Sequence, residues 1–476
     1  MLCVPPVVPR RVFREIIALF GPVLILVGCQ SYEEVPLDIP SYGAAFEARL
    51  TNTEPVTAFA QRLEAAGQAV PDEFSFEDGI SYAEGEVLAL FYNPELRISR
   101  LEAGVALATR ENAGLWDDPV FGFDGAEIVS PPTPFEYGLM LSLTIPISGR
   151  LEVEKDRAGA AYEAELREVA NAEWQLRADL RSQWATWTAA VVQAELLTDM
   201  IDDLQEINRI ADRLETAGEL NRVERRLLRI QLADMQIQAS ELQLKTIAAE
   251  VALLELLGLP PTASALLIPA FPETTPPMVD DVTKRLIDAN TELAVHFARY
   301  ETAEQDLRLE IKKQFPDIVI GSGYGTQFND HRVMFGVSIP IPILNANRKA
   351  IAEASARREV VRAEAETTYA RLIRNLAGAT TALELKETQR DRYEQEIVPM
   401  LDAQKDDIQR IADLDELDMF VLLETITRMR DAKEKLITLR LDELKSAIAV
   451  HEILGPDHTP TTPAKRTDTV VAGGIQ

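Results

Sequence analysis

The chain has 476 residues and an acidic composition, with 77 aspartates and glutamates against 48 lysines and arginines and a formal net charge of -29. An excess of negative charge this large repels nucleic acid and anionic lipid, so neither is expected as a partner. The two cysteines, Cys3 and Cys29, both lie near the N-terminus. This position excludes a disulfide framework or a thiolate metal site in the rest of the chain.

The first residues have the pattern of a bacterial lipoprotein signal peptide. Three arginines at positions 10, 11 and 14 precede an apolar run at 16–27 that is too short to cross a bilayer as a helix. Leu26-Val27-Gly28-Cys29 resembles a lipobox, which implies cleavage before Cys29 and a lipid on its thiol. Gln30 follows in place of an aspartate, which implies an outer membrane destination. The alternative is an ordinary signal segment with a chance cysteine.

The next clear pattern is a helix of about thirty residues, from Tyr82 to Asn112. Alternating strands follow it. From Phe135 to Ile145 every odd position is apolar, and most even positions are polar or small, while the preceding strand at 119–123 alternates more weakly. Strands of about ten residues suit a tilted crossing of a bilayer. A half-buried soluble hairpin would give the same alternation and remains the alternative.

A long helical pattern begins after the strands, at Gly149-Arg150, and continues to about Glu215. At 1.5 Å per residue it would reach roughly 100 Å, and its apolar residues recur at spacings of three and four, so it needs a lateral partner. After a turn at 217–220, a returning helix of about 39 residues reaches Leu257. Stacked end to end, the opening and returning helices would together cover the long one.

The whole arrangement recurs about 197 residues later. The opening helix motif Asn93-Pro94-Glu95-Leu96 returns as Asn290-Thr291-Glu292-Leu293, and Leu257-Gly258 returns as Leu454-Gly455. A repeat this long predicts two copies of one large unit rather than a solenoid.

The second copy repeats the strands and the long helix. Its strands are expected at 316–326 and 332–341, and its long helix is expected from Asn347-Arg348 to about Ala412. Four strands cannot close a barrel in lipid, where the smallest barrels have about eight strands, so several chains must share one barrel.

This order of elements, with Leu256-Leu257-Gly258-Leu259-Pro260 ending the first copy, resembles the TolC-type outer membrane factors from roughly Tyr82 to Gly455. The resemblance implies a mainly α fold with a transmembrane β-barrel. In this fold a homotrimer forms a 12-stranded barrel that a long α-helical barrel continues into the periplasm. It also implies a lipid-anchored outer membrane channel that is not an enzyme, needs no cofactor, and works with a periplasmic adaptor and an inner-membrane pump.

The local patterns and the resemblance together divide the chain into six expected segments. These are a lipoprotein signal peptide at 1–28, an N-terminal arm at 29–81, a first repeat at 82–258, a linker at 259–280, a second repeat at 281–455, and a disordered tail at 456–476.

Enzymatic and metal-binding patterns are weak. Gly321-Ser322-Gly323-Tyr324-Gly325 imitates a glycine-rich phosphate loop, but no helix follows it, and small residues on a lumen-facing strand explain it better. The histidines, at 296, 331, 451 and 458, are scattered without the spacing of metal ligands. We therefore expect no catalytic residues and no metal site.

The charged helix turns far from the strands are the candidate functional sites. The first turn is basic and the second is acidic, which suggests that the two pair across the mouth of the tube and keep it closed. Solvated helix charges are the alternative. The alignment with gate carboxylates of the family places Glu424 at one such position, whereas Val421 stands at another. The candidate gate or adaptor-binding residues are Gly218, Glu219, Arg222, Arg225, Arg226, Asp413, Asp415, Glu416, Asp418 and Glu424.

The transported substrate is less well indicated. The segment at 336–342, together with Asn347-Arg348, is similar to the form seen in heavy-metal cation efflux members of the family, although drug efflux members share much of it. A type I secretion exit duct and a non-conducting, lipid-anchored periplasmic coiled-coil scaffold are the competing functions.

Overall fold

A computed structural model describes residues 32–68, 70–71, 78–127, 129, 135–277, 281–328, 330–412 and 419–456. The chain divides into two compact units, residues 1–48 and 49–476. The predicted signal peptide and lipid-anchor residue Cys29 lie outside the described residues. In the first unit, helix α2 (Ile39–Glu47) begins at Asp38, whose side chain accepts a hydrogen bond from the Ser41 amide.

The second unit contains the order of helices and strands that the sequence predicts, although two of the predicted helices are each divided in two. The helices before the sheet and the first strand pair are α3 (Glu54–Ala65), α4 (Tyr82–Tyr92), α5 (Pro94–Glu111), β1 (Val120–Ala126) and β2 (Glu136–Ile145). The first helical hairpin is α6 (Arg150–Ala217) and α7 (Arg222–Leu257). The later elements are α8 (Val282–Ala289), α9 (Thr291–Lys312), β3 (Ile318–Gln327), β4 (Asp330–Ser338), α10 (Arg348–Arg392), α11 (Val398–Ala412) and α12 (Met419–Leu454).

The prediction of one helix from Tyr82 to Asn112 is wrong, because the chain breaks at Asn93 into α4 and α5. Pro94 lacks an amide hydrogen and disfavours helical geometry in the residue before it, so it fits the first position of a new helix. The Asn93 side chain accepts a hydrogen bond from the Leu96 amide and caps α5. The apolar periodicity continues across this break, which is why periodicity alone did not reveal it.

The four strands form one antiparallel sheet in the order β1-β2-β3-β4. The glycine-rich segment of β3 faces β2 at close range, since a Cβ atom at Gly323 or Gly325 would collide with the carbonyl oxygens of Leu139 or Tyr137. Strand packing therefore accounts for the glycines that imitate a phosphate loop. In the part of the chain that the structure describes, no helix is both long and apolar enough to span a membrane.

The first long helix, α6, is continuous over 68 residues, whereas its counterpart in the second half is interrupted. A π-helical turn at Tyr393–Ile397 separates α10 from α11, immediately before Pro399. Proline cannot donate to the carbonyl four residues earlier and its ring crowds that carbonyl, so a wider turn relieves the clash. The prediction of a single helix from Arg348 to Ala412 therefore misses this break.

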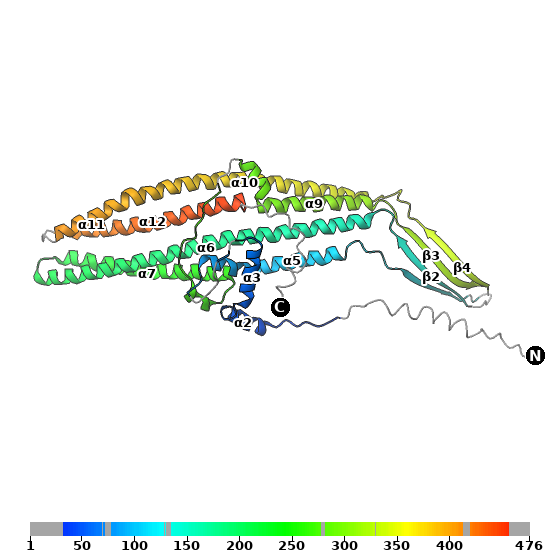
Figure 1. Cartoon of the computed structure of the whole chain (residues 1–476), viewed down its shortest axis with the longest axis horizontal. Coiled ribbons are helices and arrows are strands. Elements are labelled where there is room, and N and C mark those ends of the chain that lie inside the picture. Colours follow the sequence, from blue (N-terminus) through cyan, green and yellow to red (C-terminus); the bar gives the residue numbers. More distant parts are fainter. Residues whose placement is uncertain are drawn as a thin grey trace, which may run out of the picture. The chain divides into compact units, whose positions relative to one another are not determined.

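The long helices lie in a layer four helices wide. Next to the sheet, α6 contacts α5 and α9, and α9 contacts α10. Farther from the sheet, α6 contacts α7 and α12, and α12 contacts α10. Figure 1 shows the strands at one end of α6 and the turn into α7 at the other. Within the described elements, one side of the layer is therefore formed by β1, α5 and α7, and the other by β4, α10 and α11.

The same contacts occur twice, 197 residues apart, at two joints between helices. The first joint is where α4 meets α5 beside the end of α7, and the second is where α8 meets α9 beside the end of α12. The buried Asn93 side chain donates to the Leu256 carbonyl, and the buried Asn290 side chain donates to the Ile453 carbonyl. Gly258 and Gly455 both have a positive φ and lie close to these joints. A Cβ atom at Gly258 would collide with the Tyr92 carbonyl, and one at Gly455 would collide with the Ala289 carbonyl. The largest core cluster surrounds the first joint and includes the fully buried Trp184.

Candidate functional site

The turn between α6 and α7 is a compact, well-capped structure. Gly218 has a φ of +83° and ends α6, and the Glu219 amide donates to the Leu214 carbonyl, which together form a Schellman motif. Asn221 then caps α7 by accepting hydrogen bonds from the Val223 and Glu224 amides. Local sequence therefore determines this turn independently of any second hairpin.

Arg225 is held inside the first hairpin rather than at its surface. Its side chain is only 4% exposed, and it forms an ion pair with Asp212 of α6 and donates to the Asn208 side chain. Glu215 lies 3.8 Å away. Asn208, itself buried, also donates to the Leu228 carbonyl of α7. These polar groups link the two helices just before the turn.

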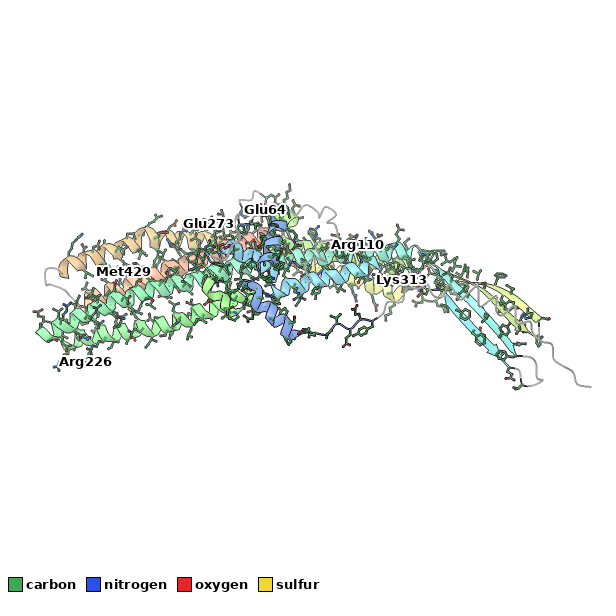
Figure 2. All side chains as sticks on the ribbon, turned by 60° about the horizontal axis from the view of Figure 1, so that its bottom comes forward. Glu64, Arg110, Arg226, Glu273, Lys313 and Met429 are labelled. Carbon is green, nitrogen blue, oxygen red and sulfur yellow. The ribbon has the colours of Figure 1, made fainter. Side chains whose placement is uncertain are left out.

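Other arginines of the turn remain at the surface. Arg222 is 85% exposed, with its guanidinium 4.0 Å from Glu215, and Arg226 is also exposed. Figure 2 labels Arg226 at this end of the hairpin. Gly218 and Glu219 are exposed as well. The surface available to a partner is therefore formed by Arg222 and Arg226 rather than by Arg225.

The predicted acidic turn, with Asp413, Asp415, Glu416 and Asp418, lies outside the described residues. Glu424, one turn into α12, is exposed and forms an ion pair with Arg428 at 2.6 Å. The neighbouring residues Leu422, Leu423 and Ile426 pack against the apolar cluster of the first hairpin. The start of α12 thus contacts the α6–α7 hairpin through apolar residues, while Glu424 is exposed to solvent.

A second polar region, which the sequence did not reveal, lies at the joint between α9 and α12. A pocket of about 490 Å³ is lined there by residues of α6, α9, α10 and α12, including Asn171, Glu292, Arg371 and Glu452. Burial raises the pKa of the Glu452 carboxyl, and the charges of Asp179 and Glu292 raise it further. Arg371 pairs with Glu292.

The side chain of Asp179, on α6, belongs to the same polar region. Burial raises the pKa of its carboxyl, and Glu95 adds to the shift. The residues of this region come from both halves of the chain, so no local sequence pattern indicates that they lie together.

Arg225, in contrast, could have been recognised as buried from its spacing. It lies three residues before Leu228 and ten before Met235, both fully buried, and these spacings place all three side chains on the face of α7 that meets α6.

The histidines lie in separate environments. The His451 ring nitrogen lies 3.3 Å from the Arg181 guanidinium, His296 bonds to Thr368, and His331 bonds to Tyr324. His458 lies outside the described residues. Among the residues that the structure covers, no group of three or more potential ligands is arranged to hold a metal ion.

The comparison with known sequences gives one distant relative. No family model matches the chain. The cobalt-zinc-cadmium resistance protein CzcC of Cupriavidus metallidurans is 21% identical over 264 residues, which cover 54% of this chain. The match spans 62% of the length of that relative.

Solved structures are much more similar in fold than in sequence. The CmeC outer membrane channel of Campylobacter jejuni matches with a TM-score of 0.68 at 13% identity, over 94% of this chain and 98% of that one. The outer membrane protein VceC of Vibrio cholerae matches with a TM-score of 0.66 at 13% identity, over 79% of this chain and 96% of that one. These matches confirm, at the level of fold, the resemblance that the repeated motifs indicated. The chain therefore has the fold of outer membrane channel proteins.

Proposed function

We propose that this chain is one subunit of an outer membrane channel in which copies share a single β-barrel. The observation that carries the proposal is the four-stranded sheet, in which β1 and β4 are the edge strands. Open edges are not tolerated in lipid, because their amide and carbonyl groups would lack hydrogen-bond partners. Another copy supplies these partners.

The strand directions allow this closure. Each neighbouring pair in the sheet is antiparallel, so β1 and β4 run in opposite directions. The β4 strand of one copy can therefore pair with β1 of the next in the same antiparallel manner. Three copies would give the twelve strands that the resemblance implies, continued by the helical layers as a tube.

The outer face of the sheet suits lipid. On β4, Val333, Phe335 and Val337 alternate along one face and are 65% to 84% exposed in the single chain. Apolar side chains at such exposure cost free energy in water, at about 25 cal/mol for each Å² exposed. A bilayer around the assembled barrel removes this cost.

The channel would be a passive conduit that works with an inner-membrane pump and a periplasmic adaptor in efflux. The acidic composition suits cationic cargo, and the relative CzcC is named for resistance to cobalt, zinc and cadmium. We therefore favour metal cations over drugs as cargo. A type I secretion exit duct remains the alternative within the same class of protein.

A lipid on Cys29 would anchor the assembly to the outer membrane, and residues 29–81 would form an N-terminal arm. The repeated contacts of Asn93 and Asn290 support a division into two related repeats, 82–258 and 281–455, joined by the linker 259–280.

The periplasmic end would be closed by charge pairing between the two turns. In this proposal Arg222 and Arg226 pair with Asp413, Asp415, Glu416 or Asp418 until a partner engages. Neutralising Arg222 and Arg226 together, as Arg222→Gln with Arg226→Gln, should raise the open probability of single channels. Arg209→Gln is the matched control, since Arg209 pairs with Glu206 on its own helix. An unchanged open probability in the double variant would exclude this gate.

The central test of the proposed function is planar-bilayer conductance of the purified mature protein, with the oligomeric mass measured in the same detergent. Discrete conductance steps from a species of three chains are expected. A monomer that stays in solution without detergent and never conducts would reject the channel and favour the coiled-coil scaffold.

A further inference from the structure

Two methionines interrupt the polar face of the sheet. The residues of β2 and β4 on the side opposite Phe335 are otherwise polar or small. They are Glu136, Gly138, Met140, Ser142 and Thr144 on β2, and Asp330, Arg332, Met334, Gly336 and Ser338 on β4. Met140 is 45% exposed, and Met334 is only partly buried. Packing in a core therefore does not explain these two side chains.

Both methionines lie in one row across the sheet, with a glycine between them. Met140 pairs with Gly323 of β3, and Gly323 pairs with Met334 of β4, so the three residues point to the same side. With strands about 4.8 Å apart, the two methionine Cα atoms are roughly 10 Å apart, within the combined reach of two flexible, unbranched side chains. The Met334 methyl carbon already leans over Gly323, since it lies 3.3 Å from the place of a Cβ atom there. The glycine thus leaves room for the two sulfurs to approach each other.

The two methionines occupy equivalent positions in the two repeats. The segment 145–147, Ile-Pro-Ile, returns as 339–341 at a spacing of 194 residues, and the same spacing relates Met140 to Met334. The nearest positions on the same face differ between the copies, because Gly138 corresponds to Arg332 and Ser142 to Gly336. Both copies therefore have methionine at the one position where the polar pattern is broken.

The surroundings keep the pair open to passing ions. Many neighbouring positions on this face of the four strands are glycines, namely Gly122, Gly138, Gly321, Gly325 and Gly336. In a ring of copies, the two thioethers of each chain would therefore project into the lumen beyond their neighbours. A site in a conducting path must bind an ion and release it again, which suits two neutral ligands better than a closed cage of charged ones.

The chemistry of the pair selects the kind of ion. Thioether sulfur is a polarisable, uncharged ligand that favours Cu(I) and similar soft cations over hard ones. Arg332 is the next residue before Met334 on this face, and its charge disfavours a site that depends on electrostatic attraction alone. We infer that Met140 and Met334 form a site for soft monovalent cations, Cu(I) or Ag(I), on the lumen face of the barrel. This inference rests on the proposed function, because the face lines a lumen only in a closed barrel.

Methyl NMR of the full mature chain tests the site, with Ag(I) as a probe that keeps its oxidation state. The protein is labelled at its methionine methyl groups and titrated with silver nitrate in chloride-free detergent buffer. The signals of Met140 and Met334 should shift along one saturating curve, whereas the signal of the exposed Met400 should not. Zinc and cobalt ions should leave all three signals in place. Equal shifts with these ions would overturn the selectivity.

Leucine variants assign the signals and test whether the two sulfurs act together. Met140→Leu and Met334→Leu conserve volume, so the fold and the oligomer should be retained, while each variant should lose the Ag(I) shift of the remaining methionine. Met400→Leu is the matched control, because it removes an exposed methionine on α11 and should leave both shifts unchanged. A shift of one methionine that persists without the other would show that they do not form a joint site.

Single-channel recordings separate the inference from the proposed function. Ag(I) in nitrate solution should briefly interrupt the wild-type current, and the variant with both leucines should conduct without interruptions. If the wild type conducts but Ag(I) neither shifts the two signals nor interrupts the current, the inference is wrong and the channel stands. Shifted signals with an uninterrupted current would place the pair outside the conduction path. Shifted signals in a protein that never conducts would reject the channel and, with it, the role of the pair in transport.

Discussion

The long helices of the two repeats, α6 and α10, occupy corresponding places in the sequence, but α6 has many more buried residues than α10. In α6, Leu180, Trp184 and Leu204 are fully buried, whereas the buried residues of α10 are Thr368, Leu372 and Leu376. The reason is position, because α6 has helices on both sides of it while the described neighbours of α10 lie on one side. In a layered molecule, the place of a helix in the layer therefore affects how many of its side chains are buried.

The largest expected loss of stability follows from creating a cavity beside α6. Trp184→Ala should destabilise the protein by about 3–5 kcal/mol, because a fully buried indole that packs on Tyr82 and Trp187 is lost. Val360→Ala in α10, where the valine is exposed, should cost less than about 1 kcal/mol. Thermal midpoints followed by circular dichroism in detergent measure both. Equal losses would show that α10 is as firmly packed as α6.

The next test concerns the ion cluster that holds the first hairpin together. Arg225→Ala should cost about 1–2 kcal/mol, because it leaves Asp212 and Glu215 without their buried partner, although Asp212 keeps some contact with water. Arg222→Ala, at an exposed position of the same turn, should change stability by less than about 0.5 kcal/mol. Denaturant midpoints distinguish the two outcomes, and a similar loss in both variants would contradict a structural role for Arg225.

The sequence predicted the order of elements because alternation and helical periodicity are local properties. The strand from Phe135 to Ile145 appears as β2, and the turn at Gly218 appears where the glycine predicts it. The breaks at Asn93 and Pro399 were missed, although both carry a proline signal, because apolar spacing continued past them. At both positions the proline, rather than the apolar periodicity, determines the local structure.

The polar sites were predicted less well, since they depend on contacts between distant segments. The basic residues around Gly218 were found, but the burial of Arg225 by Asp212 and Asn208 was not. The cluster of Asp179 and Glu452 combines α6 with α12, which are more than 200 positions apart in the chain. Spacing within one helix cannot reveal such a cluster.

A smaller effect is expected at the interruption of the second long helix. Pro399→Ala restores an amide that can donate to the Gln395 carbonyl, so the π-helical turn should relax toward an α-helix and gain about 1 kcal/mol or less. Hydrogen exchange of residues 393–400 should slow. Pro94→Ala is the matched control and should gain nothing, because proline at the first position of α5 displaces no hydrogen bond. Unchanged exchange in Pro399→Ala would mean that the turn has another cause.

The smallest effect depends on pH and again contrasts the two repeats. The half-buried Glu452 carboxyl has a raised pKa, so the folded chain binds its proton more tightly than the unfolded chain does. The tighter binding of this proton stabilises the folded state. The stabilisation is complete below the ordinary glutamate pKa of 4.5 and is lost as the pH rises through the higher pKa of the folded state.

Glu452→Gln should therefore leave the free energy of unfolding unchanged at pH 4 and raise it at pH 8, as measured from unfolding midpoints at the two pH values. The increase should be less than about 1 kcal/mol, because the group is partly solvated. Glu255, the counterpart of Glu452 on α7, is exposed, so Glu255→Gln should change neither midpoint. If the Glu452→Gln variant is instead less stable than the wild type at pH 8, the ionised carboxylate has a stabilising partner there. In that case Arg371 or Arg374, which line the same pocket, would be the cation to test next.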